Sequence, residues 1–214
     1  MLEPNLTRRK VLQLAAASSA AAGLTVYGVA ISQPAPDPIE LISYRYGDDT
    51  MTNRLLIAYA SATGTTMEIA AEMGRALNEQ GHLVDVVPIK DNPSLNGYQA
   101  VLIGSAVQHG EWLPEAIDFV ADNQSALEQL PVGVFCVHIR NTGHDENSRR
   151  EREAYLNPVR ALITPMVEGY FAGRFDRRGA YLMLPRWIAP LVPTTDLREM
   201  SRVRRWAQQL TAMF

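Results

Sequence analysis

Apolar and polar positions alternate along the chain in a regular order. Short apolar runs fit strands buried on both faces, and each run is followed by a stretch whose apolar residues recur as on one face of a helix. Five strands that alternate with helices imply a doubly wound parallel α/β sheet. The predicted strands cover residues 55–60, 83–89, 100–104, 132–137 and 169–174, and the predicted helices cover 65–80, 113–123, 151–166 and 196–214.

The turn between the first strand and the first helix consists of small and hydroxyl-bearing residues around one glycine. Such a turn forms an anion site, because backbone N–H groups and the helix dipole face the ligand. The chain lacks the Gly-x-x-x-x-Gly-Lys of nucleoside triphosphate sites and the Gly-x-Gly-x-x-Gly of dinucleotide sites. Neutral hydroxyls without a lysine suit a monophosphate held by hydrogen bonds. The candidate phosphate-binding residues are Ser61, Ala62, Thr63, Gly64, Thr65 and Thr66.

The alternative for this turn is purely structural. Thr65 is followed three residues later by Glu68, which is the spacing of a capping box. The hydroxyls would then serve only to start the helix, and the turn would bind no cofactor.

The motif Ser61-x-Thr63-Gly64-x-Thr66, preceded by an apolar strand, resembles the flavin mononucleotide (FMN) phosphate loop of the flavodoxin family. The resemblance implies a flavodoxin-like five-stranded parallel sheet in the order 2-1-3-4-5, with helices on both faces. Ligands of such sheets bind at the carboxyl ends of the strands where the order reverses, here between the first and third strands. The implied cofactor is FMN, bound without a covalent link.

Two further loops fall where this topology places the ligand. They follow the third and fourth predicted strands, and in the family such loops flank the isoalloxazine ring. Gly110 is the candidate for a peptide that approaches the flavin N5, because glycine accepts the backbone conformations that this needs. The further candidate cofactor-binding residues are Ser105, Ala106, Val107, Gln108, His109, Gly110, Trp112, His138, Asn141 and Gly143.

Two residue types in these loops leave alternatives open. Trp112 either stacks on the flavin or packs against the helix that it precedes. His109 and His138 either donate hydrogen bonds to flavin or substrate or serve as structural groups at strand ends. No catalytic residue and no metal site is predicted, because the sequence shows neither a nucleophile elbow nor the spacing of metal ligands. Cys136, the single cysteine, lies in an apolar run and is expected to be an inert core thiol.

Three segments, two of them in the last third of the chain, resemble a narrower group. Segments 101–105, 168–176 and 194–198 are similar to those of the flavodoxin-fold, menaquinone-dependent protoporphyrinogen dehydrogenases. These enzymes oxidise protoporphyrinogen and pass electrons to membrane quinones. The resemblance implies an FMN-dependent oxidoreductase with a quinone or another redox partner, and a carboxylated small-molecule substrate such as a porphyrinogen. The alternatives are a pure electron carrier and a degenerate domain that no longer binds flavin.

The first residues predict a leader rather than part of the fold. Residues 7–13, Thr-Arg-Arg-Lys-Val-Leu-Gln, resemble a twin-arginine export signal, and the alternative is an ordinary signal anchor. The uncharged stretch Leu12–Ile31 is about long enough to cross a bilayer, and the basic cluster before it would stay inside. The sequence therefore predicts a signal or membrane anchor at 1–32, a proline-bearing linker at 33–52, and an exported, outward-facing FMN-binding domain at 53–214.

Charge is divided unevenly within that domain. Residues 53–148 carry four Lys/Arg and twelve Asp/Glu, whereas 149–214 carry twelve Arg and six Asp/Glu. The basic part indicates either a surface that meets an anionic substrate or lipid headgroups, or a merely solvated face. The segment 177–193 has arginines beside Tyr181 and Trp187, so it is expected at a membrane interface, with completion of the core as the alternative. No nucleic-acid partner is expected.

Overall fold

The computed structural model describes residues 35–211, so the predicted leader lies outside the described residues. The chain divides into two compact units. The sheet unit contains Pro38–Phe175 and Thr195–Phe214, and the inserted unit contains the chain up to Asp37 together with Asp176–Thr194. Within the described residues, no helix is long and apolar enough to cross a membrane.

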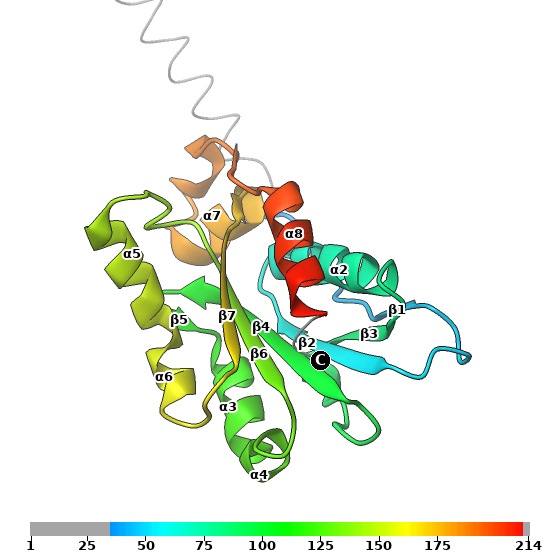
Figure 1. Cartoon of the computed structure of the whole chain (residues 1–214). Coiled ribbons are helices and arrows are strands. Elements are labelled where there is room, and N and C mark those ends of the chain that lie inside the picture. The colour runs from blue at the N-terminus through cyan, green and yellow to red at the C-terminus, as the bar shows by residue number, and fades with distance from the viewer. Residues whose placement is uncertain (1–34, 212–214) are drawn as a thin grey trace, which may run out of the picture. The chain divides into compact units, whose positions relative to one another are not determined.

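The sheet unit is built on one mostly parallel sheet (Figure 1). Its central strands lie in the order β3-β2-β4-β6-β7 and all pair in parallel, which confirms the doubly wound order predicted from the sequence. The first predicted strand lies in the middle and is buried on both faces, because every residue from Leu55 to Ala60 is at most 2% exposed. The strands are β1 (Tyr44–Tyr46), β2 (Arg54–Ala60), β3 (Leu83–Pro88), β4 (Ala100–Gln108), β5 (Glu111–Trp112), β6 (Val132–His138) and β7 (Val167–Ala172).

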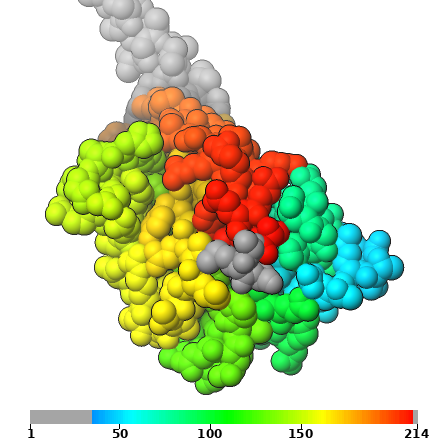
Figure 2. Space-filling model, in the orientation of Figure 1, coloured from blue at the N-terminus to red at the C-terminus, as the bar shows by residue number. Residues whose placement is uncertain are grey.

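Helices cover both faces of the sheet, each over its own apolar core. On one face α2 and α8 lie side by side (Figure 1), and their outer surfaces adjoin in Figure 2. Edge-to-face contacts of Trp206 with Phe135 and Phe171 hold α8 on the sheet. The helices of the sheet unit are α2 (Thr65–Asn78), α3 (Pro114–Asp122), α4 (Gln124–Leu127), α5 (Glu146–Glu153), α6 (Asn157–Arg160) and α8 (Met200–Leu210), with 3₁₀ helices η1 (Ile89–Asp91) and η2 (Ala154–Leu156).

The segment expected to be a linker contributes to the sheet unit, so the domain start predicted at residue 53 was wrong. β1 pairs antiparallel with β3 at the edge of the sheet, with Tyr46 opposite Val84. Just before β1, the carbonyl of Ile42 accepts a hydrogen bond of 2.7 Å from the hydroxyl of Tyr59. The sequence pattern misses this strand because three residues at a sheet edge carry little periodicity.

Two predicted helices have different limits in the structure. The predicted helix 151–166 is replaced by α5, η2 and α6, because Asp145 caps α5 with its side chain and Pro158 stands in the first turn of α6. The last helix starts later than expected, because Asp196 lies in the short strand β9 (Thr195–Asp196). This strand pairs antiparallel with β8 (Arg174–Phe175), so the chain leaves and re-enters the sheet unit through one pair of strands.

The inserted unit contains α7 (Arg177–Met183) and the 3₁₀ helix η3 (Ala189–Leu191). The carboxylate of Asp176 caps α7 by accepting two backbone N–H groups of its first turn. Three large apolar side chains of this unit, Leu182, Trp187 and Leu191, are 48–58% exposed. Completion of a core therefore does not account for these three side chains.

Candidate functional site

The predicted phosphate loop forms the turn between β2 and α2, at the carboxyl end of the strand. Gly64 stands directly before the helix with a φ of 86°, in the left-handed region that favours glycine. Its N–H donates to the hydroxyl of Ser61 over 3.0 Å, and its carbonyl accepts the N–H of Glu68. The first N–H groups of a helix have no partner within it, so this turn presents those of α2 to a ligand.

Thr66 carries the strongest indication of a ligand. Its side chain is fully buried, and its hydroxyl has no hydrogen bond to any residue that the structure describes. A buried hydroxyl without a partner costs about 1–3 kcal/mol, so native proteins keep such groups chiefly where a ligand or water satisfies them. Thr66 stands in the first turn of α2, where the helix dipole favours an anion. These features fit a bound phosphate group.

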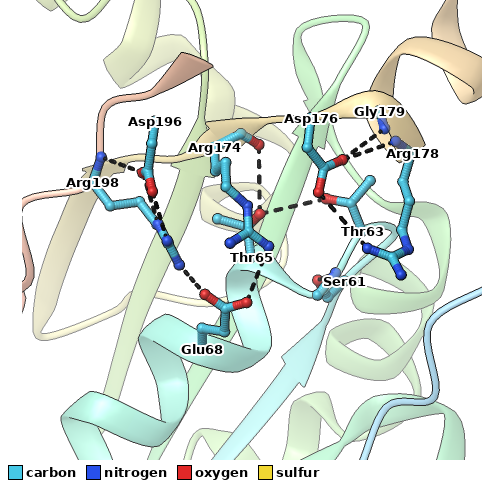
Figure 3. A network of polar contacts seen from close by, with 11 residues as sticks. Ser61, Thr63, Thr65, Glu68, Arg174, Asp176, Arg178, Gly179, Asp196 and Arg198 are labelled. Carbon is cyan, nitrogen blue, oxygen red and sulfur yellow. Dashed lines mark hydrogen bonds and ion pairs between the residues drawn. The ribbon is translucent and has the colours of Figure 1, made fainter. Parts of the chain in front are cut away.

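The capping box offered as the alternative for this turn is absent (Figure 3). Thr65 lies inside α2 rather than before it, and its hydroxyl is 3.5 Å from both the Arg174 carbonyl and the Thr63 hydroxyl. Glu68 forms ion pairs with Arg174, at 3.1 Å, and with Arg198. Because both arginines follow β7 in the chain, these pairs tie the far edge of the sheet to the first turn of α2.

Ile39 belongs to the site, although no sequence pattern points to it. A Cβ added to Gly64 would lie 2.4 Å from Cδ1 of Ile39, so this side chain packs directly on the turn. Ile39 also contacts the apolar core beneath α2. Glycine thus suits position 64 through its φ, and any larger residue there would also force the end of the Ile39 side chain to move.

The loop predicted after the third strand is a β-hairpin. β4 continues to Gln108 and pairs antiparallel with β5, so Ala106 and Val107 are also strand residues. His109 and Gly110 form the two-residue connection with φ values of 53° and 91°, as in a type I′ turn. A Cβ added to Gly110 would meet nothing within 4 Å, so there is open space beside its peptide.

Ser105 and Trp112 lie at the base of this hairpin and serve the fold. The buried hydroxyl of Ser105 accepts the N–H of Leu113 at 3.0 Å and donates to the carbonyl of Ala106 at 2.9 Å. It thereby joins β4 to the start of α3. Trp112 is 2% exposed and packs in the core on the α3 face. Trp112 therefore packs in the core, as its packing alternative states, and its indole N–H has no partner among the described residues.

His138 ends β6 and is held inside the fold. Its side chain is 4% exposed, and Nδ1 donates to the carbonyl of Arg140 at 2.6 Å. Burial lowers the pKa of His138, and the positive charges of Arg152 and Arg202 act in the same direction. His138 is therefore a neutral imidazole near pH 7, with one nitrogen fixed by the backbone.

The loop after β6 is held by the helical segment that follows it. Asn141, with a φ of 55°, donates from its side chain to the hydroxyl of Tyr155 over 2.7 Å. Arg152 donates to the carbonyls of Asn141 and Gly143 at 3.2 and 2.7 Å. Arg152 and Tyr155 were not predicted as site residues, because their distance from the loop along the chain follows no motif.

The three predicted loops come together at one edge of the sheet, because β2, β4 and β6 are parallel neighbours. Ala60, which precedes the phosphate loop, lies opposite Ser105, and Ser105 lies opposite Cys136. Cys136 is fully buried, and burial raises the pKa of its thiol. The thiol is thus an inert core group, as predicted.

The flavodoxin domain family matches residues 56–183, more than half of the chain, and this match contains all three loops. The chain belongs to the flavodoxin domain family. Oxidised Flavodoxin 1 from Bacillus cereus shares the fold of this flavodoxin domain with a TM-score of 0.50 and 13% identity, over 76% of this chain and 99% of that one. Protoporphyrinogen IX dehydrogenase (quinone) from Escherichia coli is 26% identical over 88 residues, which are 40% of this chain and 49% of that protein.

The chain thus spans about half the length of the curated relatives that it matches. Membership of the flavodoxin domain family implies a flavin and a redox function. The turn after β2 is compatible with that function, because it combines an unsatisfied hydroxyl with the start of a helix.

Proposed function

We propose that this flavodoxin domain binds FMN noncovalently, with the phosphate in the turn of residues 61–66. The observation that carries the proposal is the buried Thr66 hydroxyl, which has no partner in the described part of the chain. Ser61 and Gly64 shape the turn around it. Because the turn contains no lysine, a monophosphate suits it better than the more highly charged triphosphate.

When bound, FMN supplies one- and two-electron redox chemistry. The chain itself binds and orients this group. Thr66 and the first N–H groups of α2 would hold the phosphate, and the hairpin peptide at Gly110 would lie beside the ring. The loop after β6, fixed by Arg152, would form the opposite wall. We assign no side chain the role of an acid or base.

The proposed activity is that of a quinone-linked oxidoreductase. Its support is the 26% identity to protoporphyrinogen IX dehydrogenase (quinone) over 88 residues. We propose a carboxylated small molecule such as a porphyrinogen as the donor and a membrane quinone as the acceptor. A second candidate is a pure electron carrier that docks redox partners, and the acidic balance of residues 53–148 favours it.

We further propose that the leader exports the domain and that the protein stays at the membrane. The twin-arginine motif at Arg8 and Arg9 supports export, and the exposed Leu182 and Trp187 of the inserted unit suit a membrane interface. Replacing both arginines by lysine should keep the protein in the cytoplasm, measured by protease access to intact and lysed cells. Unchanged access would contradict the twin-arginine route.

The first test is the visible absorption spectrum of the full-length protein purified with flavin available. A yellow protein that releases FMN in equal amount to the chain supports the proposal, and a colourless protein that takes up no added FMN contradicts it. Turnover then separates the two candidates. Oxidation of protoporphyrinogen by catalytic amounts of the protein with a soluble quinone supports the enzyme, whereas electron exchange without turnover supports the carrier.

A further inference from the structure

A cavity of about 490 Å³ lies in the sheet unit, beside the edge strand β7. Its walls come from the end of β6, the loop after it, α5, β7, and the start of α8. None of its lining residues belongs to the phosphate loop or to the β4–β5 hairpin. Its volume is in the range of sites for small organic molecules, and it shares His138 and Gly143 with the loop after β6 that would form one wall of the FMN site.

The cavity carries more positive than negative charge. Arg152 and Arg202 both line it, as does one carboxylate, that of Glu199. Arg152 is held in place by its hydrogen bonds to the loop carbonyls of Asn141 and Gly143. Arg202 is exposed, and within the described residues neither it nor Glu199 forms an ion pair. Arg152, Arg202 and Glu199 together give the cavity one unbalanced positive charge.

His138 forms part of the wall of the cavity and gives it a fixed polar group. Nδ1 is occupied by the Arg140 carbonyl, whereas Nε2 has no hydrogen bond to the described residues. Burial lowers the pKa of this imidazole, and the positive charges of Arg152 and Arg202 act in the same direction. A second imidazole, that of the exposed His144, also lines the cavity.

The remaining wall is partly apolar. Leu197 is 41% exposed, although leucine is normally buried, and it faces the same cavity as Tyr170 and Ala172. The hydroxyl of Tyr170 is bound to Glu168 at 2.6 Å and to Arg160 at 2.9 Å. The ring of Tyr170 is thereby fixed by groups that do not line the cavity, and it offers a rigid apolar surface.

We propose that this cavity binds an organic monocarboxylate, with its carboxylate group at Arg152 and Arg202 and its apolar body against Leu197 and Tyr170. The planar guanidinium of Arg202 matches a carboxylate with two parallel hydrogen bonds. One unbalanced cation suits one carboxylate better than a phosphate dianion. Because β6 and β7 end at the same edge of the sheet as β2, a bound carboxylate lies on the cofactor side of the domain. The inference does not require a phosphate group in the turn of residues 61–66, because no residue of that turn lines the cavity.

The test is a titration of the full-length protein, without added flavin, with benzoate and with benzamide, its uncharged counterpart. Binding is measured by calorimetry and by the imidazole NMR signals of His138. We expect saturable binding of benzoate, weaker or no binding of benzamide, and a shift of the His138 signals. No saturable binding of benzoate, or equal binding of both probes, would overturn the proposal.

Variants of Arg202 in α8 and of Glu199 just before it test whether these residues act on the bound carboxylate. Arg202→Gln should weaken benzoate binding about tenfold or more, since a charge-assisted hydrogen bond is lost. Arg205→Gln is the matched control, because Arg205 is exposed on the same helix and does not line the cavity. Glu199→Gln should strengthen binding severalfold by removing the like charge. Equal effects of Arg202→Gln and Arg205→Gln would overturn the assignment.

A Thr66→Val variant separates this inference from the proposed function. If the FMN turn is correct and the cavity is not, Thr66→Val loses flavin while benzoate never binds. If the cavity is correct and the FMN turn is not, benzoate binds and Arg202→Gln weakens it whatever happens to flavin. The experiments therefore distinguish failure of the proposed FMN site from failure of the proposed carboxylate site.

Discussion

The turn after β2 and the hairpin after β4 occupy neighbouring positions at one edge of the sheet, yet their polar groups differ. In the turn, the hydroxyl of Thr66 is buried without a partner in the described residues. In the hairpin, the hydroxyl of Ser105 is equally buried but makes two hydrogen bonds. A buried polar group that the chain satisfies itself is part of the fold, whereas one that it leaves unsatisfied calls for a partner such as a ligand or water. Sequence composition alone does not separate these two cases.

The largest effect is expected from adding a methyl group at the glycine of each region. Gly64→Ala should lower the free energy of unfolding by about 2–3 kcal/mol, because it strains a left-handed residue and displaces the end of the Ile39 side chain. Gly110→Ala strains its φ alone, since nothing lies within 4 Å, and should cost about 1–2 kcal/mol. Urea denaturation measures both.

A double variant identifies the cause. Ile39→Ala together with Gly64→Ala should recover part of the loss relative to the sum of the single variants, because the collision is removed. Strict additivity of the two single effects would contradict the packing of Ile39 on the turn. Equal losses of unfolding free energy in Gly64→Ala and Gly110→Ala would also contradict the packing of Ile39 on the turn.

Ser105→Ala tests the buried hydroxyl that makes hydrogen bonds within the fold. The substitution leaves the buried N–H of Leu113 without its acceptor, and should lower the free energy of unfolding by about 1–3 kcal/mol. The dissociation constant of FMN should stay as in the native protein, since Ser105 faces the fold. Loss of FMN affinity in a variant that remains folded would return Ser105 to the cofactor site.

Thr66→Val tests the hydroxyl that has no partner, and it should weaken FMN binding without lowering the stability of the fold. The variant keeps the shape of threonine but removes a hydroxyl that has no partner, so flavin-free protein should be as stable as the native protein or more stable by about 1 kcal/mol. FMN should bind about tenfold more weakly, measured by quenching of flavin fluorescence. Thr66→Ser is the control and should retain most of the affinity. A loss of stability without loss of affinity would show that the hydroxyl serves the fold.

The parallel strands and the phosphate turn were predictable because both depend on local sequence. Runs such as Leu55–Ala60 can only be buried strands in an α/β chain, and a glycine among hydroxyls before a helix has few uses. The fate of Trp112 and Ser105 was not predictable, because it depends on a hairpin whose strand β5 is only Glu111–Trp112. A strand of two residues cannot be predicted from the sequence unless the strand with which it pairs is known.

The same reasoning applies to the ends of the sheet unit. β1 pairs with β3, and Asp196 pairs with Arg174 of β8 instead of starting a helix. Each of these outcomes is chosen by a tertiary contact, and the local sequence permits the other outcome equally. The contacts of Arg152 with the loop after β6 belong to this class too.

The smallest effect concerns the tip of the hairpin, where His109 has a φ of 53°. Asparagine accepts this conformation more readily than histidine, and Asn-Gly is the preferred pair of a type I′ turn. His109→Asn should therefore raise the free energy of unfolding by about 0.5 kcal/mol, seen as a higher urea midpoint with an unchanged slope. If His109 is only a turn residue, FMN affinity will not change, and the hairpin then contributes its backbone alone. A weaker FMN complex in this more stable variant would show that the imidazole binds the cofactor, and the hairpin would then share the ligand-binding role of the turn after β2.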